Sequence, residues 1–187
     1  MALRGRNSLT DEIFYFVTTS IIQHVKIFSD HDCCDALINS IKYYEQKYQF
    51  DILAYVIMPS HFHWIVEVNP SKGKISDIMR DIKKYSAWDV MDILEEKKMK
   101  NVLDVFENNS INYKDRKRKF WIRRFDDQVV RDQQMFWTKL NYIHENPVKA
   151  GLVVLPEDYK YSSARNYIFD DHSVIEVNTK MGGVKIE

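Results

Sequence analysis

The residues best suited to chemistry are two histidines separated by one residue, His61 and His63, in the segment MPSHFHWIV. The apolar residues around them predict an extended strand, in which alternate side chains project to the same face. The two imidazoles would then lie about 7 Å apart along the strand and can converge on one metal ion. Two ligands do not define a metal site, and two strand histidines satisfied by hydrogen bonds explain the pattern equally well.

A second candidate segment is a predicted helix from Asp132 to Asn146, which carries a phenol and a carboxamide. Asp132 is a suitable N-cap, and Pro147 predicts the end of the helix, because the residue before a proline disfavours helical dihedrals. Tyr142 and Asn146 are four residues apart and therefore share one face. The alternative is a partly buried tyrosine and a helix-ending asparagine. The predicted buried stripe consists of Phe136, Leu140 and Ile143.

Positive charge is concentrated between residues 114 and 124, KDRKRKFWIRR, although the chain has no net charge. Cations neutralise phosphates and aromatic faces stack on unpaired bases, so this mixture suits single-stranded or structured nucleic acid. Trp121 is the candidate stacking residue, although it can equally belong to the core. A charged run is also typical of a solvated surface. The candidate contacts to phosphates are Lys83, Lys84, Lys117, Arg118, Arg123 and Arg124.

The other elements follow from hydrophobic periodicity and turn residues. Their order favours an α+β sandwich of the ferredoxin-like or RNA-recognition-like type, with an antiparallel central sheet, helices on one face and the other face open. Residues 95–119 are polar and poorly periodic, which predicts an irregular or disordered excursion. Strands are predicted at 13–23, 50–58, 62–69 and 121–130, and further helices at 32–48, 75–94 and 162–167.

Length and composition suit one globular domain spanning 1–187, with its core at about 13–168 and a C-terminal extension at 169–187. The sequence has no apolar run of membrane-spanning length and no apolar signal-peptide core. The two cysteines are adjacent and provide neither a disulfide framework nor a zinc knuckle. We therefore expect a cytoplasmic protein that does not associate with membranes.

Two motifs in this order carry a resemblance to a known family. MPSHFHWIV resembles the histidine-hydrophobic-histidine (HUH) motif of the single-tyrosine HUH transposases. NYIHENPVKAGLV, followed by YKYSSARNY, resembles the C-terminal signature of their REP-associated tyrosine transposase branch. The resemblance extends from about Phe14 to Tyr167. The excursion at 95–119 is longer and more charged than is usual for the family.

The resemblance implies a metal-dependent endonuclease and strand transferase, with a role in DNA transposition and recombination. By motif, His61, His63 and Asn146 would hold Mg²⁺ or Mn²⁺, with no other small-molecule cofactor. Tyr142 would attack single-stranded DNA that carries a hairpin and form a 5′-phosphotyrosine intermediate. Relatives outside this branch assemble their sites across a dimer, whereas this branch is commonly monomeric, so a monomer is favoured and a dimer is the alternative.

Two other functions are consistent with the same residues. A domesticated protein of this kind would bind hairpin DNA without cutting it and would keep the basic segment. An RNA-binding module of the RNA-recognition type would use the open sheet face, and the two histidines would then be structural.

Overall fold

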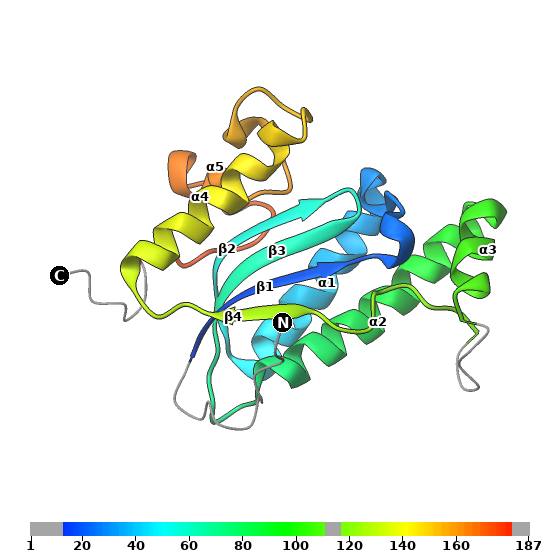
Figure 1. Cartoon of the computed structure of the whole chain (residues 1–187), viewed down its shortest axis with the longest axis horizontal. Helices are drawn as coiled ribbons and strands as arrows, with labels where there is room; N and C mark the ends of the chain where they lie inside the picture. The colour runs from blue at the N-terminus through cyan, green and yellow to red at the C-terminus, as the bar shows by residue number, and fades with distance from the viewer. Residues whose placement is uncertain (1–12, 111–116, 181–187) are drawn as a thin grey trace, which may run out of the picture.

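Four antiparallel strands form the centre of the structure, a computed structural model that describes residues 13–110 and 117–180. The strands are β1 (Phe14–Ser20), β2 (Asp51–Met58), β3 (His61–Glu67) and β4 (Asp126–Val129), in the spatial order β2-β3-β1-β4. A two-residue turn joins β2 to β3, and β1 pairs with both β3 and β4 (Figure 1). The predicted α+β class with an antiparallel sheet is confirmed.

One face of the sheet is covered by two long helices, α1 (His31–Tyr48) and α2 (Ile75–Glu96). Alternate strand residues such as Val17, Trp64 and Ile57 point to this side and are fully buried with the helices in the larger core cluster. Asp30 caps α1, because its carboxylate accepts a 3.0 Å hydrogen bond from the backbone nitrogen of Asp32. None of the helices in the described ranges has the length and apolarity needed to cross a bilayer.

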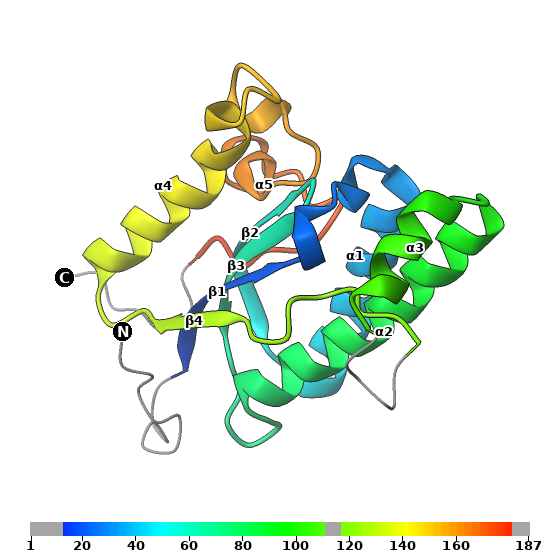
Figure 2. The same ribbon diagram turned by 45° about the vertical axis from the view of Figure 1, so that its right-hand side comes forward.

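The opposite face was predicted to stay open, and this prediction is wrong. Helix α4 (Gln133–Lys149) lies across it, as the two views show (Figures 1 and 2). The predicted stripe of Phe136, Leu140 and Ile143 packs against a second apolar cluster that includes Leu53 and Ile65. The stripe was recognisable in the sequence, but periodicity does not say which surface a helix covers.

Helix α4 begins as predicted and continues past its predicted end. The carboxylate of Asp132 accepts a 2.7 Å hydrogen bond from the backbone nitrogen of Met135, so Asp132 is the N-cap. Pro147 lies inside the last turn and is buried. The helix ends at Lys149, and Gly151, two residues later, has a φ of 68° and suits the left-handed turn after a helix. Burial of Pro147 in the packed interface outweighs its local preference against the helical conformation.

Strand β2 contains a bulge between Ile52 and Ala54, where the register with β3 shifts by one residue. Leu53 and Ala54 both belong to the cluster under α4, whereas Ile52 and Tyr55 belong to the cluster under α1 and α2. The bulge therefore sets which residues of β2 face the helix that carries the candidate nucleophile.

The outer edge of β2 is covered by residues from the C-terminal part of the chain. The backbone nitrogens of Ile57, Ser163 and Asn178 form hydrogen bonds of 2.8–2.9 Å that link β2 to this part. The residues outside β2 in these bonds, Tyr161, Ser163 and Asn178, come from the stretch before α5 (Ala164–Phe169) and from the extension that follows it. The described part of the extension thus pairs with an otherwise open edge strand.

Residues 95–119 were predicted to be irregular, and the described part is not. Helix α3 (Lys100–Asn108) packs against α2, with Leu103 and Phe106 buried. The guanidinium of Arg118 forms ion pairs with Glu95 of α2 and Glu107 of α3. These pairs hold the segment after the undescribed residues against the two helices. Residues 111–116, which include part of the basic run, lie outside the described residues. The helix has only two buried apolar residues within a charged segment, so hydrophobic periodicity did not predict it.

Other parts of the structure also differ from the predictions. The strand predicted at 121–130 is regular only in β4, and Trp121 forms an isolated bridge with Ile21. The helix predicted at 162–167 is α5, two residues later. Single turns of 3₁₀ helix, which the sequence did not predict, occur at Ile22–His24, Ile27–Ser29 and Pro156–Asp158.

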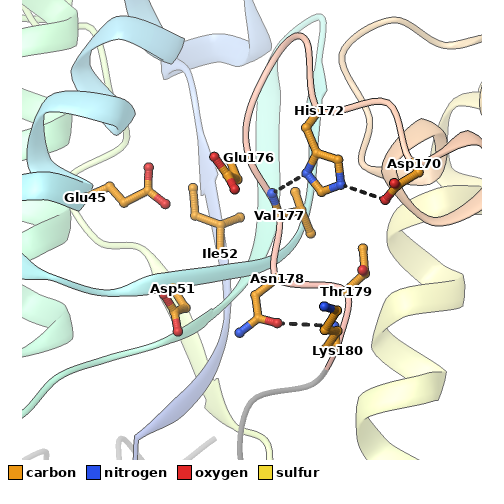
Figure 3. A pocket seen from close by; sticks show the side chains of 10 residues that line it. All are labelled: Glu45, Asp51, Ile52, Asp170, His172, Glu176, Val177, Asn178, Thr179 and Lys180. Carbon is orange, nitrogen blue, oxygen red and sulfur yellow. Dashed lines mark hydrogen bonds and ion pairs between the residues drawn. The ribbon is translucent and has the colours of Figure 1, made fainter.

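An acidic hollow of about 500 Å³ lies beside β2, between α1 and the C-terminal extension (Figure 3). Its lining includes the carboxylates of Glu45, Asp51 and Glu176. Burial, reinforced by the negative charges of Asp51 and Glu176, raises the pKa of Glu45 to about 7. This lining would repel DNA, and it belongs to a different part of the sheet from the two histidines.

Replacement of Glu45 by glutamine should change how stability depends on pH. The carboxyl has a raised pKa only in the folded state, so the folded protein binds the extra proton and loses stability as the pH rises from about 4.5 to about 7. Glutamine cannot ionise. The variant should therefore be more stable than the wild type at pH 8, by about 1 kcal/mol after allowance for partial exposure.

Urea unfolding at pH 4.5 and pH 8 measures this difference. Gln46→Ala, at the exposed neighbouring position, is the control, and its difference from the wild type should not vary with pH. A Glu45→Gln variant with the same advantage at both pH values would contradict the assignment.

Candidate active site

His61 and His63 lie on the same face of β3, the face that α4 covers. Their ring centroids are 4.9 Å apart. Burial, together with the nearby His61 and Lys139, lowers the pKa of His63 to about 3. Burial and the nearby His24 also lower the pKa of His61. Both imidazoles are therefore neutral at neutral pH, as metal ligation requires.

A hydroxyl group contacts the Nδ1 atom of each histidine. Thr18 Oγ1 lies 2.7 Å from Nδ1 of His63, and Ser60 Oγ lies 3.2 Å from Nδ1 of His61. Each hydroxyl oxygen can accept a hydrogen bond from a protonated Nδ1. This bond leaves the Nε2 lone pair for a ligand and holds the ring orientation. The chemistry of this donor set fits a divalent metal ion.

Helix α4 brings Tyr142 to this pair. The Tyr142 hydroxyl lies 3.5 Å from Nε2 of His63, and the two ring centroids are 5.1 Å apart. The ring of Phe16 stacks on His63 and meets Tyr142 edge-on. His63 is only 3% exposed, whereas Tyr142 is 42% exposed. Tyr142 therefore contacts a buried histidine and is itself exposed, so a large substrate can reach the tyrosine.

Asn146 lies one turn after Tyr142 on α4 and is half-buried. Across residues 13–110 and 117–180, no three His, Cys, Asp or Glu side chains come together in a way that could hold a metal ion. The amide oxygen of Asn146, the third ligand that the family resemblance implies, is a donor of another type.

Two residues beside the pair were not singled out from the sequence. Thr18 reaches His63 because β1 and β3 pair in a register that places these residues opposite each other. Lys139, three residues before Tyr142, places its ammonium 4.5 Å from the ring centroid of Phe16. The register of two strands distant in sequence carries no local signal. The three-residue spacing of Lys139 and Tyr142 on a helix could have identified the lysine.

Three of the predicted nucleic-acid contacts have roles inside the protein. Trp121 is only 6% exposed and belongs to the core under α1 and α2. The ammonium of Lys83 donates a 2.7 Å hydrogen bond to the carbonyl oxygen of Ile122, and burial lowers its pKa to about 8. Arg118 forms the ion pairs with the two glutamates described above.

The other four predicted contacts are on the surface. The side chains of Lys117, Arg123 and Arg124 are exposed. The ammonium of Lys84 lies 4.7 Å from the ring centroid of Trp88, on the outer side of α2, and Trp88 is itself largely exposed. The basic residues identified from the sequence therefore do not form a single group around Tyr142.

His144, which was predicted to lie outside the site, fixes α4 against the C-terminal part of the chain. Its Nε2 lies 2.9 Å from Oγ of Ser163, and the same hydroxyl oxygen accepts a hydrogen bond from the backbone nitrogen of Tyr55. Burial lowers the pKa of His144 to about 4, so the ring is neutral and its Nε2 shares a hydrogen bond with the Ser163 hydroxyl. This chain of bonds connects α4, the residue before α5, and β2.

The sheet thus carries two histidines on one strand, and the helix packed over them places a tyrosine beside them. Residues 11–146 match the family model described as "Transposase IS200 like", and the chain belongs to this family.

Within the family, the chain is similar to REP-associated tyrosine transposases. A protein of Haemophilus influenzae that is assigned by name to this group is 25% identical over 158 residues, which are 84% of this chain and 83% of the relative. A solved structure of a REP-associated tyrosine transposase bound to a REP hairpin has the same fold, with a TM-score of 0.66 and 19% identity. The likeness covers 95% of this chain and 99% of that one. The predicted resemblance is confirmed.

Replacement of His144 by phenylalanine should destabilise the protein. The new ring can still pack against Tyr167, but the buried Ser163 hydroxyl loses its hydrogen-bond partner on α4. An unsatisfied buried polar group costs about 1–3 kcal/mol, and denaturant unfolding should show a loss in this range. Asn141→Ala, at an exposed position of the same helix, should change the free energy of unfolding by less than about 0.5 kcal/mol. Equal stabilities of the two variants would argue against the bond.

Proposed function

We propose that this protein is a metal-dependent endonuclease and strand transferase that acts on single-stranded DNA carrying a hairpin, with Tyr142 as the nucleophile. The observation that carries the proposal is the 3.5 Å distance between the Tyr142 hydroxyl and Nε2 of His63, beside the second histidine. Membership of the IS200-like transposase family and a REP hairpin bound to a solved relative support the choice of DNA as substrate.

In the proposed reaction, the phenolic oxygen of Tyr142 forms a bond to a phosphorus atom of the DNA backbone. The bond from that phosphorus to the 3′ oxygen breaks, and the proton lost from the phenol is balanced by the proton gained by the new 3′-hydroxyl. The product is a 5′-phosphotyrosine link. An aryl oxide is a good leaving group, so a 3′-hydroxyl can later reverse the step and join strands without an external energy source.

His61, His63 and Asn146 are proposed to hold the metal ion, which polarises the phosphate and fixes the line of attack when it is bound. The Thr18 and Ser60 hydroxyls keep the two imidazoles oriented for this task. Two nitrogen ligands make the site softer than magnesium prefers, so we expect tighter binding of Mn²⁺ than of Mg²⁺.

One chain supplies both the histidines and the tyrosine, so we propose that a monomer is sufficient for cleavage. The fixed geometry between β3 and α4 holds the nucleophile ready without help from a second copy. Exposed Lys117, Arg123 and Arg124 are the candidates for contacts to the DNA backbone.

Replacement of Tyr142 by phenylalanine should abolish the covalent link to DNA while leaving hairpin binding unchanged. The variant keeps the ring that packs on His63 and Phe16 but lacks the attacking oxygen. The measurement is the slower-migrating protein-DNA adduct on a denaturing gel, with hairpin-bearing single-stranded DNA and Mn²⁺.

Tyr43→Phe is the matched control, because Tyr43 is a largely exposed tyrosine on the far side of the sheet. It should form the adduct as the wild type does. Hairpin binding without any adduct in the wild type would favour the binding function over cleavage. Absence of both would eliminate the two DNA-based functions.

Replacement of Thr18 by valine should weaken Mn²⁺ binding. Valine keeps the shape and the strand preference of threonine but removes the hydroxyl that orients His63. Loss of such a partner weakens metal affinity by about 10- to 100-fold, which calorimetric titration with Mn²⁺ can measure. Thr19→Val is the control, since Thr19 points to the other face of β1 and its buried hydroxyl has no hydrogen-bond partner among the described residues. Unchanged Mn²⁺ affinity in Thr18→Val would rule out this role for Thr18.

A further inference from the structure

Lys139 occupies a defined position relative to the nucleophile on α4. At about 100° per residue, Lys139 and Asn146 lie about 60° and 40° around the helix from Tyr142, and on the same side of it. Lys139 is one turn before the tyrosine and Asn146 is one turn after it. This side is the one next to the buried stripe that faces the sheet. The phenol is therefore flanked by a cation and an amide.

The ammonium of Lys139 lies close to the histidine-tyrosine pair. It lies 4.5 Å from the ring centroid of Phe16, and that ring stacks on His63 and contacts Tyr142. A positive charge is thus held at the edge of the proposed reaction centre.

Within the described part of the chain, no carboxylate forms an ion pair with Lys139. The Lys139 side chain is only half-buried, and Tyr142 on the same helix is 42% exposed. A cation held in this way, next to a nucleophile, suits an anion that arrives with the substrate.

We propose that Lys139 is a catalytic residue that binds a nonbridging oxygen of the phosphate attacked by Tyr142. This inference rests on the proposed function. It adds a second positive group, besides the metal ion, and Lys139 lies on the same side of Tyr142 as Asn146. Negative charge accumulates on the phosphate oxygens when the phenolic oxygen adds to phosphorus. An ammonium already in place stabilises that charge more than it stabilises the bound DNA, so its effect is on the rate.

The test compares Lys139→Gln, Lys139→Arg and the control Lys149→Gln in single-turnover formation of the covalent adduct at saturating hairpin-bearing DNA with Mn²⁺. Lys149 is an exposed lysine in the last turn of the same helix. We expect Lys139→Gln to slow adduct formation by about 100-fold and Lys139→Arg to recover most of the rate, because arginine keeps the charge. Lys149→Gln should react within about twofold of the wild type, as expected for a charge away from the phosphate.

Two further measurements distinguish this role from a structural one. Hairpin affinity and Mn²⁺ affinity should both be unchanged in Lys139→Gln, since its effect is on the reaction step. A normal rate in Lys139→Gln, a loss that arginine does not restore, or a loss that comes from weaker binding of DNA or metal would overturn this inference alone. Absence of any adduct in the wild type would overturn the proposed function and this inference with it.

Discussion

The packing of α4 onto the sheet is the constraint on which the candidate site depends. Phe136, Leu140 and Ile143 press into the apolar surface formed by β2, β3 and β1, and this contact fixes both the distance and the rotation of the helix. Each buried side chain of this size contributes about 1.5–3 kcal/mol relative to exposure. Rotation by one residue, about 100°, would carry Tyr142 away from His63. The same apolar contact that stabilises the fold therefore aligns the nucleophile.

Two sets of polar contacts accompany this packing. In the first, His144 of α4 is linked through the Ser163 hydroxyl to the backbone of β2. In the second, Thr18 of β1 contacts His63 of β3, the residue that Tyr142 approaches. The motifs around Tyr142 and Ser163 are thus complementary parts of one structure. The first supplies the chemical group, and the second holds its helix in place.

The parts of the site that follow a local period could be predicted from the sequence. The spacing of His61 and His63 on a strand, and of Tyr142 and Asn146 on a helix, places each pair on one face wherever these elements lie. That Tyr142 meets His63 could not be derived from periodicity, because it depends on which face of the sheet α4 covers. The resemblance to a family supplied that expectation.

Residues with several plausible environments were harder to assign. Trp121, Lys83 and Arg118 have the composition of a nucleic-acid surface, yet the first is core and the other two bind groups of the protein itself. Their partners come from distant segments. Helix α3 was missed for a related reason: its two buried residues, Leu103 and Phe106, are too few to stand out among charges. Burial is a property of the assembled fold, and composition reports it poorly where charged and aromatic residues mix.

The bulge in β2 makes the site sensitive to chain length in one place. Side chains of a strand alternate with a period of two, and the extra residue at Leu53 reverses the phase between the first and second parts of β2. Deletion of one residue there would exchange the two faces on one side of the bulge, so that residues such as Val56 could no longer face α4 without moving Ile52 out of the other core. The number of residues in β2 is therefore constrained as well as their types. Insertions and deletions in β2 should be rarer among functional variants than substitutions.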